Sequence, residues 1–250
     1  MVIAGRRDER ARELARNVMV DAGSLNQSTF KHADLIIEAI TEDLPSKIKV
    51  LKQLEGWAQN EAIIATNTSS LRLDALAQKL RDASRFVGLH FLNPAELTAV
   101  VEVIPGSCTS AKVIGSVCEF VVQIGKKPLL LKHDLPGFIW NRIQFAVLRE
   151  CLHMLREGIA DASSIDAAVA DGLAPRWMGA GPLATAQLGG LHTFKRVAEE
   201  LFPRLANDQD VGSSLDDALF TWDSIHLSRI TELRRDALTT GRKFTARRAD

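Results

Sequence analysis

Residues 62–71 of this 250-residue chain read Ala-Ile-Ile-Ala-Thr-Asn-Thr-Ser-Ser-Leu. Four apolar residues are followed directly by a run of hydroxyl and amide side chains. A short apolar run of this kind is consistent with a buried strand, and the polar residues after it mark the point where the strand ends. A twisted sheet can bring such polar residues into one crevice with groups from other parts of the chain.

Similar apolar runs lie on both sides of this stretch and alternate with amphipathic helical patterns. The runs are residues 2–4, 35–37, 86–89, 99–101 and 129–131. We expect Gly23 to end the first helix, Ser46 to cap a second helix, and a further helix to begin near Ala111. This interleaving predicts an α/β domain with a largely parallel sheet.

The pattern changes after Lys132-His133-Asp134. Residues 138–158 read as one long helix, and no later stretch reads as a strand. Further helices are expected to start at Ser163 or Ser164 and at Pro182, and residues 224–239 predict a last one. The sequence therefore predicts an α/β domain over residues 1–133 and an all-helical domain over residues 134–250.

Composition excludes several classes of function. Lys plus Arg and Asp plus Glu both total 31, so the formal net charge is zero and no overall field favours nucleic acid or an anionic membrane. The three cysteines are not in metal-ligand spacing, which predicts a reducing compartment and no metal site. No stretch approaches the roughly 20 apolar residues of a membrane helix, and no signal peptide is evident, so we expect a soluble, cytoplasmic protein.

Two further segments contain side chains that could take part in a reaction. Gly88-Leu89-His90-Phe91-Leu92-Asn93-Pro94 leads to Val101-Glu102-Val103, and Pro136-Gly137-Phe138 precedes Asn141-Arg142. With Thr66-Asn67-Thr68-Ser69-Ser70-Leu71 they supply an imidazole, a carboxylate, a carboxamide and a hydroxyl. These four groups suit the removal of a proton from an alcohol while a hydride leaves the same carbon.

In this order and spacing, the three segments resemble the 3-hydroxyacyl-CoA dehydrogenase family, which includes the lambda-crystallin and gulonate dehydrogenase branch and carnitine dehydrogenase. The resemblance covers both domains, from about Ala33 to Gly190. It implies a Rossmann-type dinucleotide-binding domain followed by a helical domain that commonly dimerises. It also implies NAD as the cofactor, a small-molecule substrate of the acyl-CoA type, and a homodimer.

The resemblance also implies roles for individual residues. His90 would be the general base, Glu102 would orient it, and Ser69 and Asn141 would hydrogen-bond the reacting oxygen. The positions that contact the dinucleotide in the family correspond here to Glu42, Lys47, Ser69 and Asn93. Each of these residues also has a structural interpretation. On pattern alone Glu42 and Lys47 are surface charges, and Ser69 belongs to a loop or helix cap.

The chain departs from the family at its start. It contains no G-x-G-x-x-G loop, and residues 2–8 resemble the family's second strand and the turn after it. We therefore expect an N-terminally truncated Rossmann-type domain, explained by a misplaced start codon, a fragment or decayed gene, or a local rearrangement. The acidic residue that binds the ribose of NAD is replaced by Gly5, followed by Arg6 and Arg7, which makes NADP an alternative cofactor. Residues 95–98 also differ from the acyl-CoA enzymes.

The expected function is oxidation of the 3-hydroxyl of a 3-hydroxyacyl-CoA to the ketone, with hydride transfer to NAD. Two alternatives stay open. One is a dehydrogenase of a free hydroxy acid similar to gulonate or carnitine, because residues 142–144 and 171–177 resemble that branch too. The other is a catalytically dead remnant or binding subunit, because the glycine loop is absent.

Overall fold

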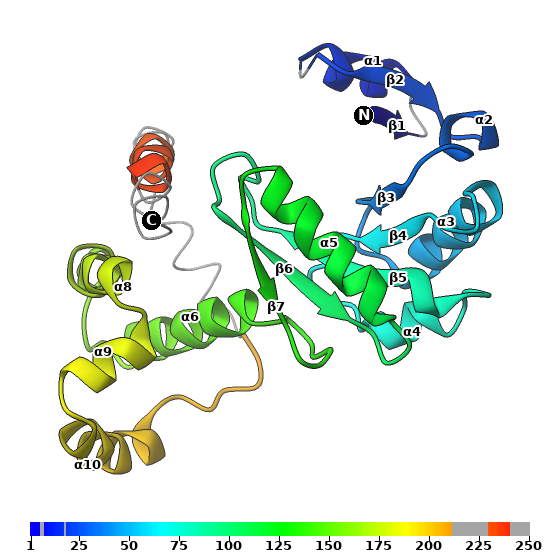
Figure 1. Ribbon diagram of the computed structural model, residues 1–250. Coiled ribbons are helices and arrows are strands. Elements are labelled where there is room, and N and C mark those ends of the chain that lie inside the picture. The colour runs from blue at the N-terminus through cyan, green and yellow to red at the C-terminus, as the bar shows by residue number, and fades with distance from the viewer. Residues whose placement is uncertain (6–7, 18, 212–229, 241–250) are drawn as a thin grey trace. The chain divides into compact units, whose positions relative to one another are not determined.

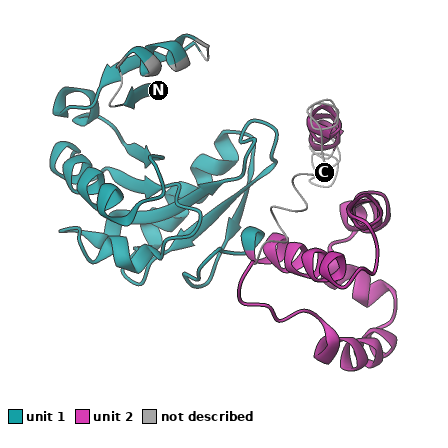
Figure 2. Ribbon diagram, turned by 180° about the vertical axis from the view of Figure 1, so that it is seen from behind, with its two compact units in different colours: residues 1–141 teal, residues 142–250 magenta. Residues whose placement is uncertain are grey.

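The computed structural model describes residues 1–5, 8–17, 19–211 and 230–240, and the chain divides into two compact units, residues 1–141 and 142–250 (Figure 2). The sequence placed the boundary after residue 133, and the structure places it after Asn141. The physical reason is Phe138, which is fully buried in the hydrophobic core of the first unit. The segment that joins the two units is therefore packed into the first of them.

The first unit is built on a five-stranded sheet in the order β3-β4-β5-β6-β7 (Figure 1). Its strands are β3 (Leu35–Glu38), β4 (Ile63–Thr66), β5 (Phe86–Phe91), β6 (Val100–Pro105) and β7 (Lys127–Leu130). The pairs β3–β4, β4–β5 and β6–β7 are parallel, and β5–β6 is antiparallel. The predicted apolar runs thus form the strands of an α/β domain with a largely parallel sheet.

Helices cover both faces of this sheet, because residues along each strand alternate between two hydrophobic cores. One core joins Ile64 and Phe86 to α3 (Leu44–Trp57) and α4 (Leu73–Ala77). The other joins their neighbours Ala65 and Val87 to α5 (Ala111–Gln123), which lies across the strands in Figure 1. Successive strand residues point to opposite faces, so a sheet covered on both sides needs these uninterrupted apolar runs.

A separate two-stranded parallel sheet precedes the large one in the chain. It pairs β1 (Val2–Gly5) with β2 (Asp21–Ser24), accompanied by α1 (Asp8–Asn17) and α2 (Gln27–Phe30). The expectation that Gly23 ends a helix is wrong. The helix α1 ends at Asn17, and Gly23 lies in β2, where it pairs with Ala4 of β1. A Cβ at Gly23 would lie 2.7 Å from Cγ2 of Thr29, so close approach of the next helix accounts for the glycine.

The start of α3 also differs from expectation. Asp43, rather than Ser46, is the N-cap residue, and its carboxylate accepts the Ser46 amide at 2.9 Å. The helix begins at Leu44 with Pro45 in its first turn, where a proline costs no hydrogen bond. Asp and Ser are both favourable N-caps, so the sequence located the helix start to within a turn but not to the residue.

Gly88 in β5 gives a testable consequence of this packing. A Cβ at Gly88 would lie 3.0 Å from both Cβ of Ile104 and Cδ2 of Leu73. We expect Gly88→Ala to lower the free energy of unfolding by about 1–3 kcal/mol through overpacking, measured by urea denaturation. Gly115→Ala is the matched control: it lies inside α5 with no atom within 4 Å of the added Cβ, and should stabilise by about 0.5–1 kcal/mol. Equal effects of the two substitutions would contradict the packing argument.

The described part of the second unit consists of helices. They are α6 (Trp140–Arg156, which begins in the first unit), α7 (Ala162–Ala167), the π-helix η2 (Ala168–Leu173), α8 (Ala174–Gly179), α9 (Pro182–Leu188), α10 (Leu191–Leu201) and the short η3 (Phe202–Arg204). Residues 230–240 are also helical, whereas residues 224–229 of the predicted last helix lie outside the described residues. Asp161 caps α7 in place of Ser163 or Ser164, and Pro182 occupies the first turn of α9 as predicted. In the described ranges no helix is long and apolar enough to span a bilayer.

Candidate active site

The antiparallel pairing of β5 with β6 brings His90 and Glu102 together. The two residues are direct cross-strand partners, and Nδ1 of His90 lies 2.7 Å from Oε2 of Glu102. Both side chains are buried, at 4% and 0% exposure. The imidazole also packs against the ring of Phe138, with 5.4 Å between ring centroids. Neighbouring strands thus form a carboxylate–imidazole pair whose ring orientation is fixed from two sides.

The other oxygen of Glu102 holds the start of a helix. Oε1 accepts the backbone N–H groups of Ile139 at 2.8 Å and Trp140 at 2.9 Å, where α6 begins. Burial raises the pKa of the Glu102 carboxyl, but the hydrogen bonds from His90 and the two amides outweigh burial, so the pKa lies below its usual value. Glu102 is therefore ionised at neutral pH and links the imidazole to the first turn of α6.

Ser69 lies in the turn that follows β4, on the other side of the imidazole. Its Oγ is 3.2 Å from Nε2 of His90, and its backbone carbonyl accepts Nδ2 of Asn141 at 3.2 Å. Since an ionised Glu102 can only accept, the Nδ1–H of His90 donates to it, and in the neutral form of the ring Nε2 carries the lone pair that faces Ser69. The structure thus brings together the four residues predicted as catalytic.

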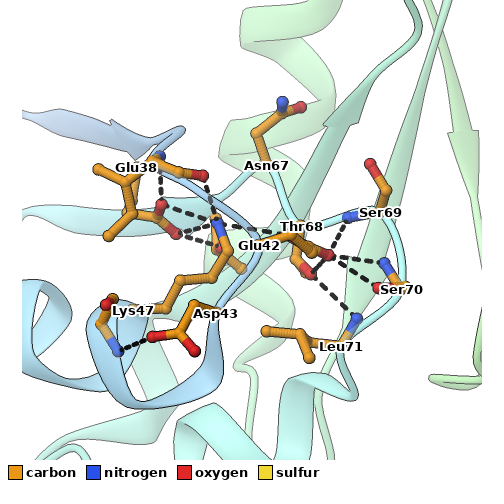
Figure 3. A network of polar contacts seen from close by, with 12 residues as sticks. Glu38, Glu42, Asp43, Lys47, Asn67, Thr68, Ser69, Ser70 and Leu71 are labelled. Atoms are coloured by element: carbon orange, nitrogen blue, oxygen red, sulfur yellow. Dashed lines mark hydrogen bonds and ion pairs between the residues drawn. The ribbon is translucent and has the colours of Figure 1, made fainter.

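Glu42 organises the turn that carries Ser69 (Figure 3). Its Oε1 accepts the Thr68 hydroxyl, the amides of Ser69 at 2.8 Å and Ser70 at 2.9 Å, and the Ser70 hydroxyl at 3.1 Å. Burial acts to raise the pKa of Glu42, but these hydrogen bonds and the nearby Lys47 ammonium lower it from 4.5 to about 2. Glu42 is thus a partly exposed anion beside the predicted catalytic residues.

The remaining residues predicted to contact the dinucleotide lie in different environments. Asn93 is exposed, two residues after the end of β5. Lys47, which the pattern alone placed on the surface, is fully buried in α3, and its ammonium donates to Glu38 and to the carbonyl of Ile40. Ser69 therefore contacts His90, Glu42 contacts the Ser69 turn, and Lys47 is buried against Glu38.

Three further residues, to which the sequence motifs gave no individual role, shape this site. Glu38, at the end of β3, is buried and accepts the Thr66 hydroxyl at 2.6 Å. The side-chain oxygen of Asn67 accepts the amide of Phe91 at 2.7 Å and so ties the end of β4 to the residue after His90. Phe138 holds a left-handed backbone conformation, with φ of 50°. The sequence did offer a signal for Glu38, because a charged residue directly after an apolar run marks the end of a strand.

The arrangement offers proton chemistry to a ligand at the carboxyl ends of β3, β4 and β5. In the described residues no group of three or more His, Cys, Asp or Glu side chains could hold a metal ion. Glu42, Ser69 and Asn93 follow β3, β4 and β5 respectively, and in open α/β sheets ligands bind at this edge. Gly5, Arg6 and Arg7, on which the NADP alternative depends, include two residues outside the described part of the chain.

A largely parallel α/β domain with a polar cluster at the carboxyl ends of its strands, followed by helices, is an architecture of dinucleotide-binding proteins. Residues 4–134 match the 3-hydroxyacyl-CoA dehydrogenase NAD-binding domain, and residues 137–230 match the C-terminal domain of the same family. The chain belongs to the 3-hydroxyacyl-CoA dehydrogenase family, and NAD is the cofactor of the matched domain.

The similar proteins include a 3-hydroxyacyl-CoA dehydrogenase and an enzyme named for a different substrate. A probable 3-hydroxybutyryl-CoA dehydrogenase of Deinococcus radiodurans is 37% identical over 72% of this chain and 63% of its own length. The 5-formyl-3-hydroxy-2-methylpyridine 4-carboxylate 5-dehydrogenase of Mesorhizobium japonicum is 31% identical over 72% of this chain and 58% of its own length. A crystal structure of an enzyme of the latter name, described as an NAD⁺-dependent dismutase, matches with a TM-score of 0.87 at 25% identity, covering 97% of this chain and 89% of that one. In the two sequence alignments, this chain therefore spans less than two thirds of the length of the curated relative.

Proposed function

We propose that this chain oxidises the 3-hydroxyl of a short-chain 3-hydroxyacyl-CoA to the ketone, with hydride transfer to NAD. The observation that carries the proposal is the continuous contact from Glu102 through His90 to Ser69, with 2.7 Å at one ring nitrogen and 3.2 Å at the other. Family membership and the 3-hydroxybutyryl-CoA dehydrogenase relative support this choice of substrate.

In this proposal Nε2 of His90 takes the proton of the substrate hydroxyl. Glu102 keeps Nδ1 protonated and stabilises the imidazolium that forms, because its carboxylate is ionised and buried against the ring. Ser69 and Asn141 hydrogen-bond the oxygen that gains carbonyl character. NAD, when bound, would accept the hydride from the carbon that carries this hydroxyl. The apolar face of Phe138 excludes water from one side of the imidazole.

A substrate without CoA is the second candidate, and the likeness to the Mesorhizobium enzyme favours it. The name of that relative specifies a pyridine carboxylate with a formyl group rather than an acyl-CoA. A hydrated aldehyde carries O–H and C–H on one carbon, so the same base can remove a proton while the hydride leaves, giving a carboxylic acid. A free hydroxy acid similar to gulonate or carnitine would likewise lose its hydroxyl proton to this base while a hydride leaves the same carbon. Residues 95–98, which differ from the acyl-CoA enzymes, are compatible with this candidate.

Cofactor titration and a substrate panel test both candidates. Titration of the 250-residue chain with NADH, followed by nicotinamide fluorescence, should show saturable binding, with weaker binding of NADPH. NADH production should then be faster with 3-hydroxybutyryl-CoA than with free hydroxy acids or a pyridine aldehyde. The reverse order of rates would favour the second candidate. No binding at millimolar cofactor would contradict catalysis by this chain and favour the binding-subunit alternative.

We further propose a homodimer formed through the second unit. Its described helices expose large apolar side chains and bury few: Leu183 is 88% exposed, Leu188 80% and Phe202 71%. Exposed apolar surface of this kind is typical of subunit interfaces, and a second copy of the chain is the partner that the family resemblance suggests. Sedimentation velocity should give twice the mass of the 27.4 kDa chain.

A further inference from the structure

Strands β4 and β5 separate close to the residues that we place in the mechanism. Their parallel pairing ends with Thr66 opposite Gly88, whereas β5 continues to Phe91 and pairs with β6 up to that residue. After Thr66 the chain leaves the sheet and forms the turn that carries Ser69. His90 therefore lies beyond the part of β5 that is paired with β4.

The side chain of Asn67 makes a contact to β5 where the β4 backbone no longer does. Its Oδ1 accepts the amide of Phe91 at 2.7 Å. The backbone amide of Asn67 donates to the carbonyl of Glu38, the last residue of β3, at 2.7 Å. In Figure 3 the Asn67 side chain points away from the polar network around Glu42 and Lys47. One residue thus joins the carboxyl ends of three neighbouring strands.

The hydrogen bond between Asn67 and Phe91 connects the two segments that carry Ser69 and His90. Asn67 lies two residues before Ser69, and Phe91 directly follows His90. The carboxylates described above hold the Ser69 turn and the imidazole individually, whereas this bond links one segment to the other. It therefore restrains the 3.2 Å distance between Oγ of Ser69 and Nε2 of His90.

We propose that Asn67 is a positioning residue that sets the distance between the Ser69 hydroxyl and the His90 imidazole through the Phe91 amide. Its effect on turnover rests on the proposed function of these two groups. The distance itself is a property of the folded chain and can be measured without a substrate. The rival interpretation is that Asn67 supports only the stability of the fold.

NMR on the full chain without cofactor measures this distance. In the wild-type chain we expect a nuclear Overhauser effect between the Cβ hydrogens of Ser69 and the Cε1 hydrogen of His90, and slow hydrogen exchange of the Phe91 amide. Asn67→Leu keeps a similar side-chain volume but has no acceptor. It should weaken the Overhauser effect and speed exchange of the Phe91 amide about tenfold, because that amide loses its partner.

Two further variants control for other consequences of the substitution. Asn67→Asp keeps an oxygen acceptor at the same place, so both signals should stay close to those of the wild-type chain. Asn60→Leu is the same substitution at an exposed turn residue and should change neither signal. If Asn67→Asp loses both signals as Asn67→Leu does, the acceptor is not the cause and the proposal is wrong.

Kinetics then tests what the distance does for turnover. In an active enzyme, kcat at saturating substrate and cofactor should fall about 10- to 100-fold in Asn67→Leu, since a misplacement of about 1 Å can cost about 10²-fold. The kcat of Asn67→Asp should stay closer to that of the wild-type chain. An unchanged Overhauser effect, or an unchanged kcat, in folded Asn67→Leu would overturn the proposal.

A variant that fails to fold also gives a result. If Asn67→Leu is unfolded, Asn67→Ala takes its place, because it removes the acceptor and adds no bulk. Failure of both variants to fold would support the rival interpretation and overturn the proposal. A wild-type chain without turnover would contradict the proposed function alone, because the NMR measurements need no substrate.

Discussion

Replacing His90 by Gln is expected to lower kcat by about 10²–10⁴-fold, the usual contribution of a general base. Glutamine fills a similar volume and can hydrogen-bond Ser69, but it cannot take a proton at neutral pH. Because His90 is buried between Glu102 and Phe138, the substitution should leave NADH affinity close to that of the unsubstituted chain. The measurement is steady-state kinetics together with an NADH titration of both proteins.

His133→Gln is the matched control, since His133 is exposed and lies outside the cluster. It should change neither turnover nor affinity. Turnover of His90→Gln within a few fold of the unsubstituted chain would remove His90 from the mechanism. Loss of NADH binding together with turnover would instead indicate a structural role for the buried imidazole.

Replacing Glu102 by Gln is expected to lower both turnover and stability. The carboxylate accepts hydrogen bonds from His90, Ile139 and Trp140, whereas a carboxamide has one acceptor oxygen and turns an N–H₂ group toward the remaining donors. We expect kcat to fall at least about 10²-fold because the imidazole loses its tautomer control. The unfolding free energy should fall by about 1–3 kcal/mol because a buried donor is left unsatisfied. A loss of turnover without any loss of stability would show that the Glu102 contact to α6 does not support the fold.

The same carboxylate predicts a pH dependence of stability. The native pKa of Glu102 lies below its ordinary 4.5, so the ionised form stabilises the folded chain above that pH. This contribution is lost as the pH falls from 4.5 through the lower native pKa. The free energy of unfolding, measured by urea denaturation, should therefore fall more steeply below pH 4.5 for the unsubstituted chain than for Glu102→Gln. Parallel pH profiles would contradict the assignment of this pKa.

The apolar runs predicted the fold well, because a strand covered on both faces must be apolar throughout. β3, β4, β5, β6 and β7 each overlap such a run, although β6 and β7 share only two residues with theirs. β2, with the sequence Asp-Ala-Gly-Ser, carries no run and was missed, since pairing with β1 alone makes it a strand. The direction of β6 was also not predictable, because strand direction depends on the path of the chain rather than on the composition of the strand.

The identities of the site residues came from the sequence, and their connections came from the tertiary structure. The resemblance of short motifs to the family selected His90, Glu102, Ser69 and Asn141, because the motifs occur in the family's order and spacing. That β5 and β6 run in opposite directions, so that residues 90 and 102 face each other, depends on backbone pairing across the sheet. The burial of Lys47 could not be read from the sequence, because a lysine in the first turn of a helix is usually exposed. A charge enters a protein interior only where partners from distant segments compensate it, and that compensation exists only after the chain has folded.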